Sequence, residues 1–166
     1  MPAARYAAPC DSVWIDLSKG LGCPIGAVLA GSAAFIDDAL IWKHRLGGAM
    51  RQSGILAAAG LYALDHNVER LAEDHQNVNR LANLLKEVPG LELQPRRDFT
   101  NILFLDLVGT GIVAPLLAEA LLREGIRVNV EGQDRIRLVT HLDVSTEDVE
   151  VAGRAIVNAL AQLRTA

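Results

Sequence analysis

The chain has 166 residues, of which 51% are hydrophobic and 4% aromatic, and its formal net charge is −4. This composition excludes a disordered chain, and the acidic balance argues against nucleic acid or an anionic membrane as partner, because both attract clustered Lys and Arg. No apolar run reaches the roughly 18 residues that a membrane-spanning helix needs, and Cys10 and Cys23 are too few for a disulfide framework or a zinc site. We therefore expect a cytoplasmic protein without a metal site.

The first part of the chain predicts two strands and two helices. Residues 12–17 alternate between apolar and polar side chains, which predicts a strand, and "GAVLAG" (26–31) predicts a second, buried strand. Helical spacing predicts a helix over 32–46, and the apolar residues 55–64 are typical of a buried helix. A buried strand needs neighbours on both sides, yet residues 1–64 offer no further strand. We therefore expect the chain to be a fragment or a truncated gene product.

The clearest helix comes next. Residues that would line one of its faces recur at steps of three and four: Val68, Leu71, His75, Val78, Leu81 and Leu85. The "VPG" at 88–90 ends this helix. His75 lies on the apolar stripe, which predicts a packed or hydrogen-bonded core histidine rather than a ligand.

Residues 89–166 predict a self-contained βαββα layer. The stretch "LELQPRRDFT" (91–100) is polar and predicts an irregular segment, after which "NILFLDL" (101–107) predicts a strand. Residues 112–124 predict a helix, and Gly125 has the position of its C-cap.

A hairpin and a last helix complete this layer. Residues 126–130 and 135–141 alternate on either side of the turn "EGQD", which predicts two paired strands. Ser145 and Asp148 have near capping-box spacing and therefore predict the start of the last helix.

A single lysine follows the first predicted strand, in a setting rich in glycine. Lys19 stands between Ser18 and Gly20 in "DLSKGLG". A lysine that forms a Schiff base must be deprotonated, and desolvation or nearby positive charge favours that state. Small neighbours leave room for a planar cofactor and let the backbone approach it. By spacing alone, a surface lysine in a glycine-rich turn is the commoner explanation.

Four longer strings resemble the low-specificity L-threonine aldolases, which are pyridoxal 5'-phosphate (PLP) enzymes of the β-eliminating lyase group. The strings are "DSVWIDLSKGLGCPIGAVLAG" (11–31), "WKHRLGGAMRQSGILAAAGLYAL" (42–64), "TNILFLDL" (100–107) and "IRLVTHLDVS" (136–145). The resemblance implies the α/β, aspartate-aminotransferase-like fold of PLP-dependent transferases. It assigns residues 1–64 to the C-terminal portion of the PLP-binding large domain, 65–88 to a connecting helix and 89–166 to a small C-terminal α+β domain.

The resemblance also implies site residues. Lys19 matches the lysine that forms the Schiff base with PLP, and Ser18 and Gly20 belong to the same cofactor-binding string. Arg51 matches the arginine that reaches the cofactor phosphate from a neighbouring subunit, which implies a homo-oligomer, a dimer or a tetramer. Arg137 matches the arginine that holds the substrate α-carboxylate. A guanidinium can bind phosphate or carboxylate through two parallel hydrogen bonds, which an ammonium cannot do.

The implied reaction is retro-aldol cleavage of L-threonine or L-allo-threonine, which are β-hydroxy-α-amino acids, to glycine and acetaldehyde. In the family, the first half of the chain supplies the side chains that contact the pyridine ring. About 18 residues precede Lys19, so we expect the isolated chain to be inactive. Two alternatives stay open: a catalytically inactive remnant that acts as a binding or oligomerisation module, and a PLP-dependent β-eliminating lyase.

Overall fold

The computed structural model describes residues 2–94 and 99–165, which divide into two compact units, Met1–Val68 and Glu69–Ala166. The elements of the first unit are α1 (Ala3–Ala7), β1 (Ser12–Asp16), η1 (Lys19–Leu21), β2 (Ala27–Gly31), α2 (Ala33–Arg45) and α3 (Gly54–His66). Those of the second are α4 (Leu71–Leu85), β3 (Glu92–Gln94), β4 (Ile102–Asp106), η2 (Val108–Thr110), α5 (Ala114–Arg123), β5 (Asn129–Val130), β6 (Arg135–Val139) and α6 (Thr146–Thr165). Within the described residues, no helix is long and apolar enough to cross a membrane.

The first unit contains both expected strands. β1 and β2 pair antiparallel, from Ser12 opposite Gly31 to Asp16 opposite Ala27. The expectation of a buried second strand is wrong, because every residue of β2 is exposed. Among the described residues β2 pairs with β1 alone, so its apolar side chains have no covering layer.

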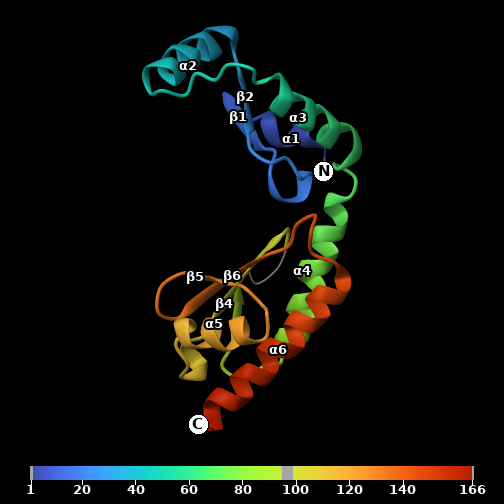
Figure 1. Ribbon diagram of the computed structural model, residues 1–166, viewed down its shortest axis with the longest axis vertical. Coiled ribbons are helices and arrows are strands. Elements are labelled where there is room, and N and C mark those ends of the chain that lie inside the picture. The colour runs from blue at the N-terminus through green and yellow to red at the C-terminus, as the bar shows by residue number, and fades with distance from the viewer. Residues whose placement is uncertain (1, 95–98, 166) are drawn as a thin grey trace. The chain divides into compact units, whose positions relative to one another are not determined.

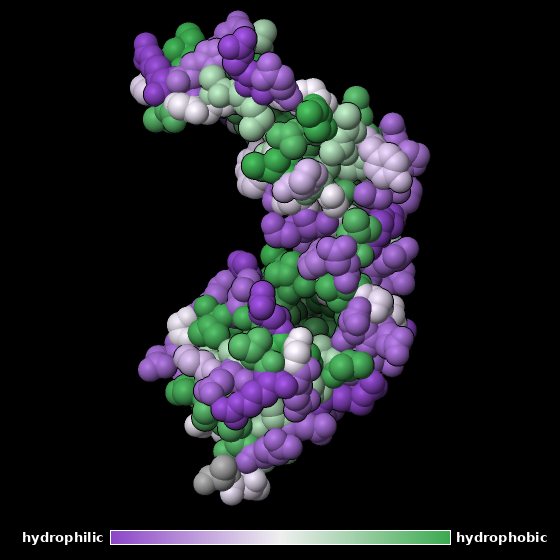
Figure 2. Space-filling view, in the orientation of Figure 1, coloured by the Kyte–Doolittle hydropathy of each residue, from purple (hydrophilic) through white to green (hydrophobic). Residues whose placement is uncertain are grey.

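The two longer helices of this unit also form where the periodicity predicts them. Ser32 caps α2, since its hydroxyl accepts a hydrogen bond from the Phe35 N–H over 3.3 Å. The expectation that the next helix is buried is wrong: α3 buries only Gly60 and Ala63, while Ile55 is 80% exposed. Figure 2 shows hydrophobic residues at the surface of this unit.

The second unit is a two-layer α/β structure. Its antiparallel sheet has the strand order β3-β4-β6-β5, and α4, α5 and α6 cover one face (Figure 1). The core between the layers is built of aliphatic side chains from all three helices and both central strands, among them Leu81, Leu117, Ile156, Leu105 and Ile136. Strand β3 lies in a stretch for which an irregular segment was the expectation; Leu93 pairs with Leu105 and packs against the core. The rest of that irregular stretch, 95–98, lies outside the described residues.

The N-terminal half of α4 buries polar side chains instead of the expected histidine. His75 is exposed, so its assignment to the core is wrong, whereas Asp74 and Asn77 are buried. Asn77 Nδ2 donates to the Val144 carbonyl over 3.2 Å, and the Thr140 hydroxyl donates to the Asp74 carbonyl over 2.9 Å. These bonds attach α4 to the segment after β6 and accompany the burial of Asp74 in place of His75, whereas Val78, Leu81 and Leu85 are buried as the stripe predicts.

Both helix-terminus predictions in this unit are confirmed. Gly125 has φ +79°, the left-handed conformation of a C-terminal cap, and its N–H donates to the Leu122 carbonyl over 3.0 Å. At the start of α6, the Ser145 hydroxyl accepts from the Asp148 N–H over 3.1 Å. The Asp148 carboxylate accepts in return from the N–H and the hydroxyl of Ser145. These two hydrogen bonds hold the pKa of Asp148 below its ordinary value.

Candidate functional site

The segment that joins β1 to β2, residues 17–26, is a closed loop that we call the lysine loop. The Leu17 N–H donates to the Gly26 carbonyl, and the Cys23 N–H donates to the Leu17 carbonyl, each over 3.0 Å. Leu17 and Cys23 are both buried, so the neck of the loop rests on the small core of the first unit. The loop therefore has a defined backbone path.

Helix α3 supports the lysine loop from its C-terminal half. Asn67, the residue after α3, donates from Nδ2 to the Leu21 carbonyl over 2.8 Å. A side chain at Gly60 would come within 3.2 Å of the Leu17 side chain, so the absence of one lets the helix approach the loop closely. These contacts explain why the buried residues of an otherwise exposed helix are small.

Lys19 begins the 3-10 turn η1 with a backbone conformation that is rare for its residue type. Its φ is +59°, the left-handed region, which costs a non-glycine residue about 1 kcal/mol. Its side chain is exposed, and Nζ donates to the Ser18 hydroxyl over 3.2 Å. The Ser18 hydroxyl and N–H in turn donate to Asp16 over 2.6 and 2.9 Å, which holds the pKa of that carboxyl below its ordinary value.

Arg51 lies in the segment between α2 and α3 and is exposed. Among the described residues, no hydrogen bond or ion pair engages its guanidinium. Its neighbour Gln52 has φ +53° and, with Lys19, is one of two non-glycine residues with positive φ in the part of the chain that the structure describes. Lys19 is itself a residue that the sequence nominates for the cofactor, and Gln52 is next to another, Arg51. Strained backbone is often found at functional positions.

Arg137 lies on the open face of the sheet in the second unit. Alternation along β6 directs Ile136 toward the helices and puts Arg135 and Arg137 on the opposite face. The pairing of β4 with β6 sets Asp106 opposite Arg135 and Phe104 opposite Arg137. This face of the sheet therefore carries polar side chains, whereas the face toward the helices is apolar.

The two arginines of this face have different surroundings. Arg135 donates to both carboxylate oxygens of Asp106, over 2.5 and 3.0 Å, and its guanidinium carbon lies 5.6 Å from the centre of the Phe104 ring. The hydrogen bonds with Asp106 raise the pKa of Arg135 above its ordinary value. Within residues 2–94 and 99–165, the guanidinium of Arg137 makes one ion pair, with Glu131 over 3.2 Å from Nη1 to Oε1, and its buried Nε has no hydrogen-bond partner. Arg135 is thus held by a carboxylate through two hydrogen bonds, whereas Arg137 has a single ion-pair contact.

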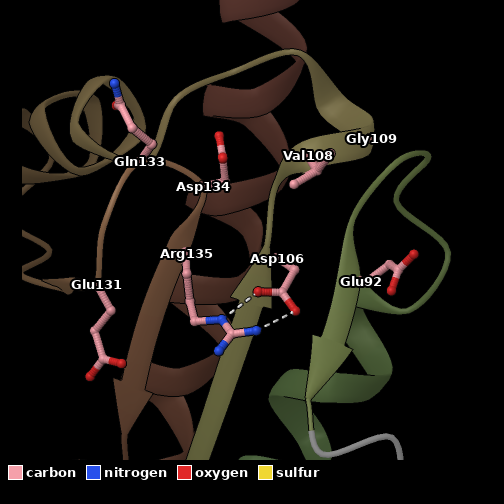
Figure 3. A pocket seen from close by; sticks show the side chains of 8 residues that line it. All are labelled: Glu92, Asp106, Val108, Gly109, Glu131, Gln133, Asp134 and Arg135. Carbon is pink, nitrogen blue, oxygen red and sulfur yellow. Dashed lines mark hydrogen bonds and ion pairs between the residues drawn. The ribbon is translucent and has the colours of Figure 1, made fainter.

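An open pocket of about 660 Å³ lies on the same side of the sheet, where Arg135 and Glu131 belong to its lining (Figure 3). Its lining is largely acidic and comprises Glu92, Asp106, Val108, Gly109, Glu131, Gln133, Asp134 and Arg135. Sequence reasoning nominated none of these residues. The alternation of β6 was the available signal, because it puts Arg135 on the same face as Arg137.

The nominated residues fall into three places. Ser18, Lys19 and Gly20 lie together in the lysine loop, where Gly20 is buried directly after Lys19. Arg51 lies elsewhere in the same unit, and Arg137 belongs to the second unit. Of the nominated residues, the structure thus brings Ser18, Lys19 and Gly20 together in one loop.

Comparison with known proteins shows which family the chain resembles. A family model described as beta-eliminating lyase matches residues 1–109. The low specificity L-threonine aldolase of Escherichia coli (strain K12) is 46% identical over 144 residues, which cover 86% of this chain and 41% of the relative. The chain thus spans about two fifths of the length of that curated relative.

Solved structures agree with the expected fold class. Serine palmitoyltransferase of Sphingomonas wittichii matches with a TM-score of 0.74 at 21% identity, over 98% of this chain and 42% of that one. A subgroup IV aspartate aminotransferase of Thermus thermophilus matches with a TM-score of 0.69 at 18% identity, over 95% and 51%. The α/β, aspartate-aminotransferase-like fold is therefore confirmed, and the chain belongs to the beta-eliminating lyase family.

Proposed function

We propose that the chain carries the lysine and the carboxylate-binding arginine of a PLP-dependent aldolase that cleaves L-threonine or L-allo-threonine to glycine and acetaldehyde. The observation that carries the proposal is Lys19, which a closed loop holds in a left-handed conformation with its amine exposed. The name and the 46% identity of the Escherichia coli relative support the choice of reaction. Because the chain spans 41% of that relative, the activity is proposed for the whole protein.

The residues present fit PLP. The aldehyde of PLP requires a reachable primary amine, which Lys19 offers, and Gly20 adds no side chain beside it. The phosphate requires a cation with free donors, and the exposed Arg51 has no ion pair among the described residues. Lys19, Ser18 and Gly20 would hold the reactive end of the cofactor, and Arg51, from a neighbouring copy, its phosphate. When bound, PLP supplies an electron sink for cleavage of the Cα–Cβ bond.

The chain's own residues would orient the amine and the substrate. Ser18 Oγ accepts a hydrogen bond from Lys19 Nζ and donates to Asp16, so the serine fixes the direction of Nζ. The low pKa of Asp16 keeps this carboxylate ionised and able to accept that bond. Arg137 would bind the substrate carboxylate through two parallel hydrogen bonds, which holds the breaking bond in one orientation.

Covalent labelling tests the lysine assignment. The 166-residue chain is incubated with PLP, reduced with borohydride and digested, and mass spectrometry then locates the pyridoxyl group. We expect labelling at Lys19 that the Lys19→Arg variant loses, whereas Lys43→Arg and Lys86→Arg, which alter the other two lysines, retain it. Labelling spread evenly over the three lysines would contradict the assignment. We expect no acetaldehyde release from L-threonine by these 166 residues alone.

A second candidate function is a binding or oligomerisation module without catalysis. The observation that favours it is the exposure of large apolar side chains in the first unit, namely Trp14, Ile15, Val28, Leu29, Phe35, Leu40, Ile41, Trp42, Leu46, Ile55, Leu61, Tyr62 and Leu64. Sedimentation equilibrium with and without PLP separates the two functions. Association without any labelling of Lys19 would favour the module, and labelling of Lys19 would favour the enzyme.

A further inference from the structure

Glu131 is the ion-pair partner of Arg137 on the open face of the sheet, so it affects which ligand carboxylate can bind there. Glu131 lies at the start of the turn between β5 and β6. Its N–H donates to the Arg135 carbonyl over 2.8 Å, so the backbone of the turn continues the pairing of the two strands. Glu131 therefore starts from a fixed backbone position opposite Arg135, from which its side chain reaches Arg137.

The contact between the two side chains is a partial one. Nη1 of Arg137 lies 3.2 Å from Oε1 of Glu131, and the two side chains are 37% and 38% exposed. A guanidinium that fully engages a carboxylate makes two parallel bonds, as Arg135 does with Asp106 on the same face. A half-exposed, single-contact ion pair contributes little to stability, so a ligand carboxylate can displace Glu131 at small cost.

The surroundings remain negative after that displacement. Glu92, Asp106, Glu131 and Asp134 line the adjoining pocket, and Arg135, the cation of that lining, is bound to Asp106 (Figure 3). A ligand with one carboxylate exchanges one anion for another at Arg137. A ligand with a second carboxylate adds an uncompensated negative charge beside Glu131, and like charges at such distances repel.

We propose that Glu131 is a specificity-determining residue: it occupies Arg137 until a substrate carboxylate displaces it, and it selects neutral zwitterionic amino acids over amino dicarboxylates. The inference rests on the proposed role of Arg137 in carboxylate binding, and it adds the substrate class that this site accepts. L-threonine and L-aspartate form the informative pair, because both present an α-carboxylate and an α-ammonium and only the second carries another carboxylate.

The side-chain Nε–Hε signal of Arg137 in nitrogen-15 NMR spectra of the full chain provides the test, since the Arg137→Lys variant identifies it by its loss. In the unsubstituted chain, L-threonine shifts this signal with about tenfold higher affinity than L-aspartate does. In Glu131→Gln we expect about threefold tighter L-threonine binding and about tenfold tighter L-aspartate binding, which reduces the preference to about threefold.

Asp134→Asn is the matched control, because it removes the same charge from the same pocket without touching Arg137. We expect this control to change the preference by less than twofold.

An equal effect of the two variants, an unchanged preference in Glu131→Gln, or no response of the Arg137 signal to either amino acid would overturn the proposal. If Arg137 responds as expected while Lys19 is not labelled by PLP, the aldolase proposal fails and the role of Glu131 stands. If Lys19 is labelled and Glu131→Gln has no effect, only the role of Glu131 fails.

Discussion

The amine of Lys19 donates a hydrogen bond of 3.2 Å to the hydroxyl of Ser18, the residue directly before it in the chain. Lys19 begins the turn η1 and has φ +59°. The same hydroxyl donates a hydrogen bond of 2.6 Å to Asp16, the last residue of β1. Two features thus hold the amine of Lys19: the positive φ of its backbone and the relay of hydrogen bonds from Lys19 through Ser18 to Asp16. Each can be tested separately.

The strain at Lys19 predicts an unusual effect of glycine. We expect Lys19→Gly to be about 1 kcal/mol more stable toward unfolding than Lys19→Ala, because glycine adopts positive φ without steric cost. Urea unfolding followed by tryptophan fluorescence measures this difference in the first unit, which contains both tryptophans, Trp14 and Trp42. The same pair of substitutions at Lys43, within α2, provides the control, where we expect glycine to be the less stable by about 0.5–1 kcal/mol. The same sign at both positions would contradict strain at Lys19.

Removal of the Ser18 hydroxyl tests the relay. In Ser18→Ala we expect the pKa of Asp16 to rise toward its ordinary value, because the hydroxyl makes the largest contribution to lowering it. Since the folded pKa is the lower one, Asp16 contributes stability above its unfolded pKa and loses it as the pH falls through the folded pKa. Carboxyl carbon-13 NMR titration measures the shift, with Ser32→Ala, at the cap of α2, as the control. A pKa of Asp16 that is the same in Ser18→Ala would refute the relay.

The buried carboxylate of Asp74 predicts a large loss of stability. Asp74 accepts a hydrogen bond from Arg70 over 3.0 Å, and their side chains are 1% and 16% exposed. We expect Asp74→Ala to lower the free energy of unfolding by about 3 kcal/mol, because it removes a buried carboxylate that is paired with a largely buried guanidinium. Urea unfolding followed by circular dichroism measures this loss.

Glu73 offers the control for that substitution, since it lies 3.7 Å from the same guanidinium but is 67% exposed. Glu73→Ala should change stability by less than about 0.5 kcal/mol. The double variant Arg70→Met/Asp74→Leu should recover much of the loss, because it removes both buried charges. A double variant as unstable as Asp74→Ala would show that the charge imbalance is not the cause.

The capping box at the start of α6 predicts a pH dependence. Its hydrogen bonds lower the folded pKa of Asp148, so its stabilisation is present above the unfolded pKa and disappears as the pH falls through the folded value. Asp148→Asn should flatten the stability of the second unit over that range. Ser145→Ala should lower stability by about 1 kcal/mol at neutral pH through loss of the helix cap. Thermal unfolding at a series of pH values measures both, and parallel curves for Asp148→Asn and the unsubstituted chain would contradict the assignment.

The sequence by itself determined most of the local structure and the family. Periodicity located β1, α2 and α6, and continuous apolar runs located β2 and α3, because both signals are properties of neighbouring positions. Ser145 and Gly125 were recognisable as helix caps for the same reason, since each interacts within a few residues of itself. The "DLSKGLG" string pointed to Lys19 because it is contiguous in the chain.

Only the tertiary structure decided which side chains of a helix or strand are buried and which hydrogen-bond donors already have a partner. Periodicity favoured His75 for the core of α4, yet hydrogen bonds from Thr140 and to Val144 bury Asp74 and Asn77 instead. Such partners lie more than 60 residues away, and no local pattern specifies them.

The same reason separates the two arginines of β6. Both have the same residue type and the same face, so alternation along the strand cannot distinguish their contacts, and the family resemblance alone nominated Arg137. The register of β4 against β6 puts Asp106 opposite Arg135, which binds it through two hydrogen bonds, and the turn after β5 brings Glu131 to Arg137 with a single contact. Strand register and turn geometry, which depend on pairing between distant segments, therefore decide that Arg135 is bound through two hydrogen bonds and Arg137 through a single contact.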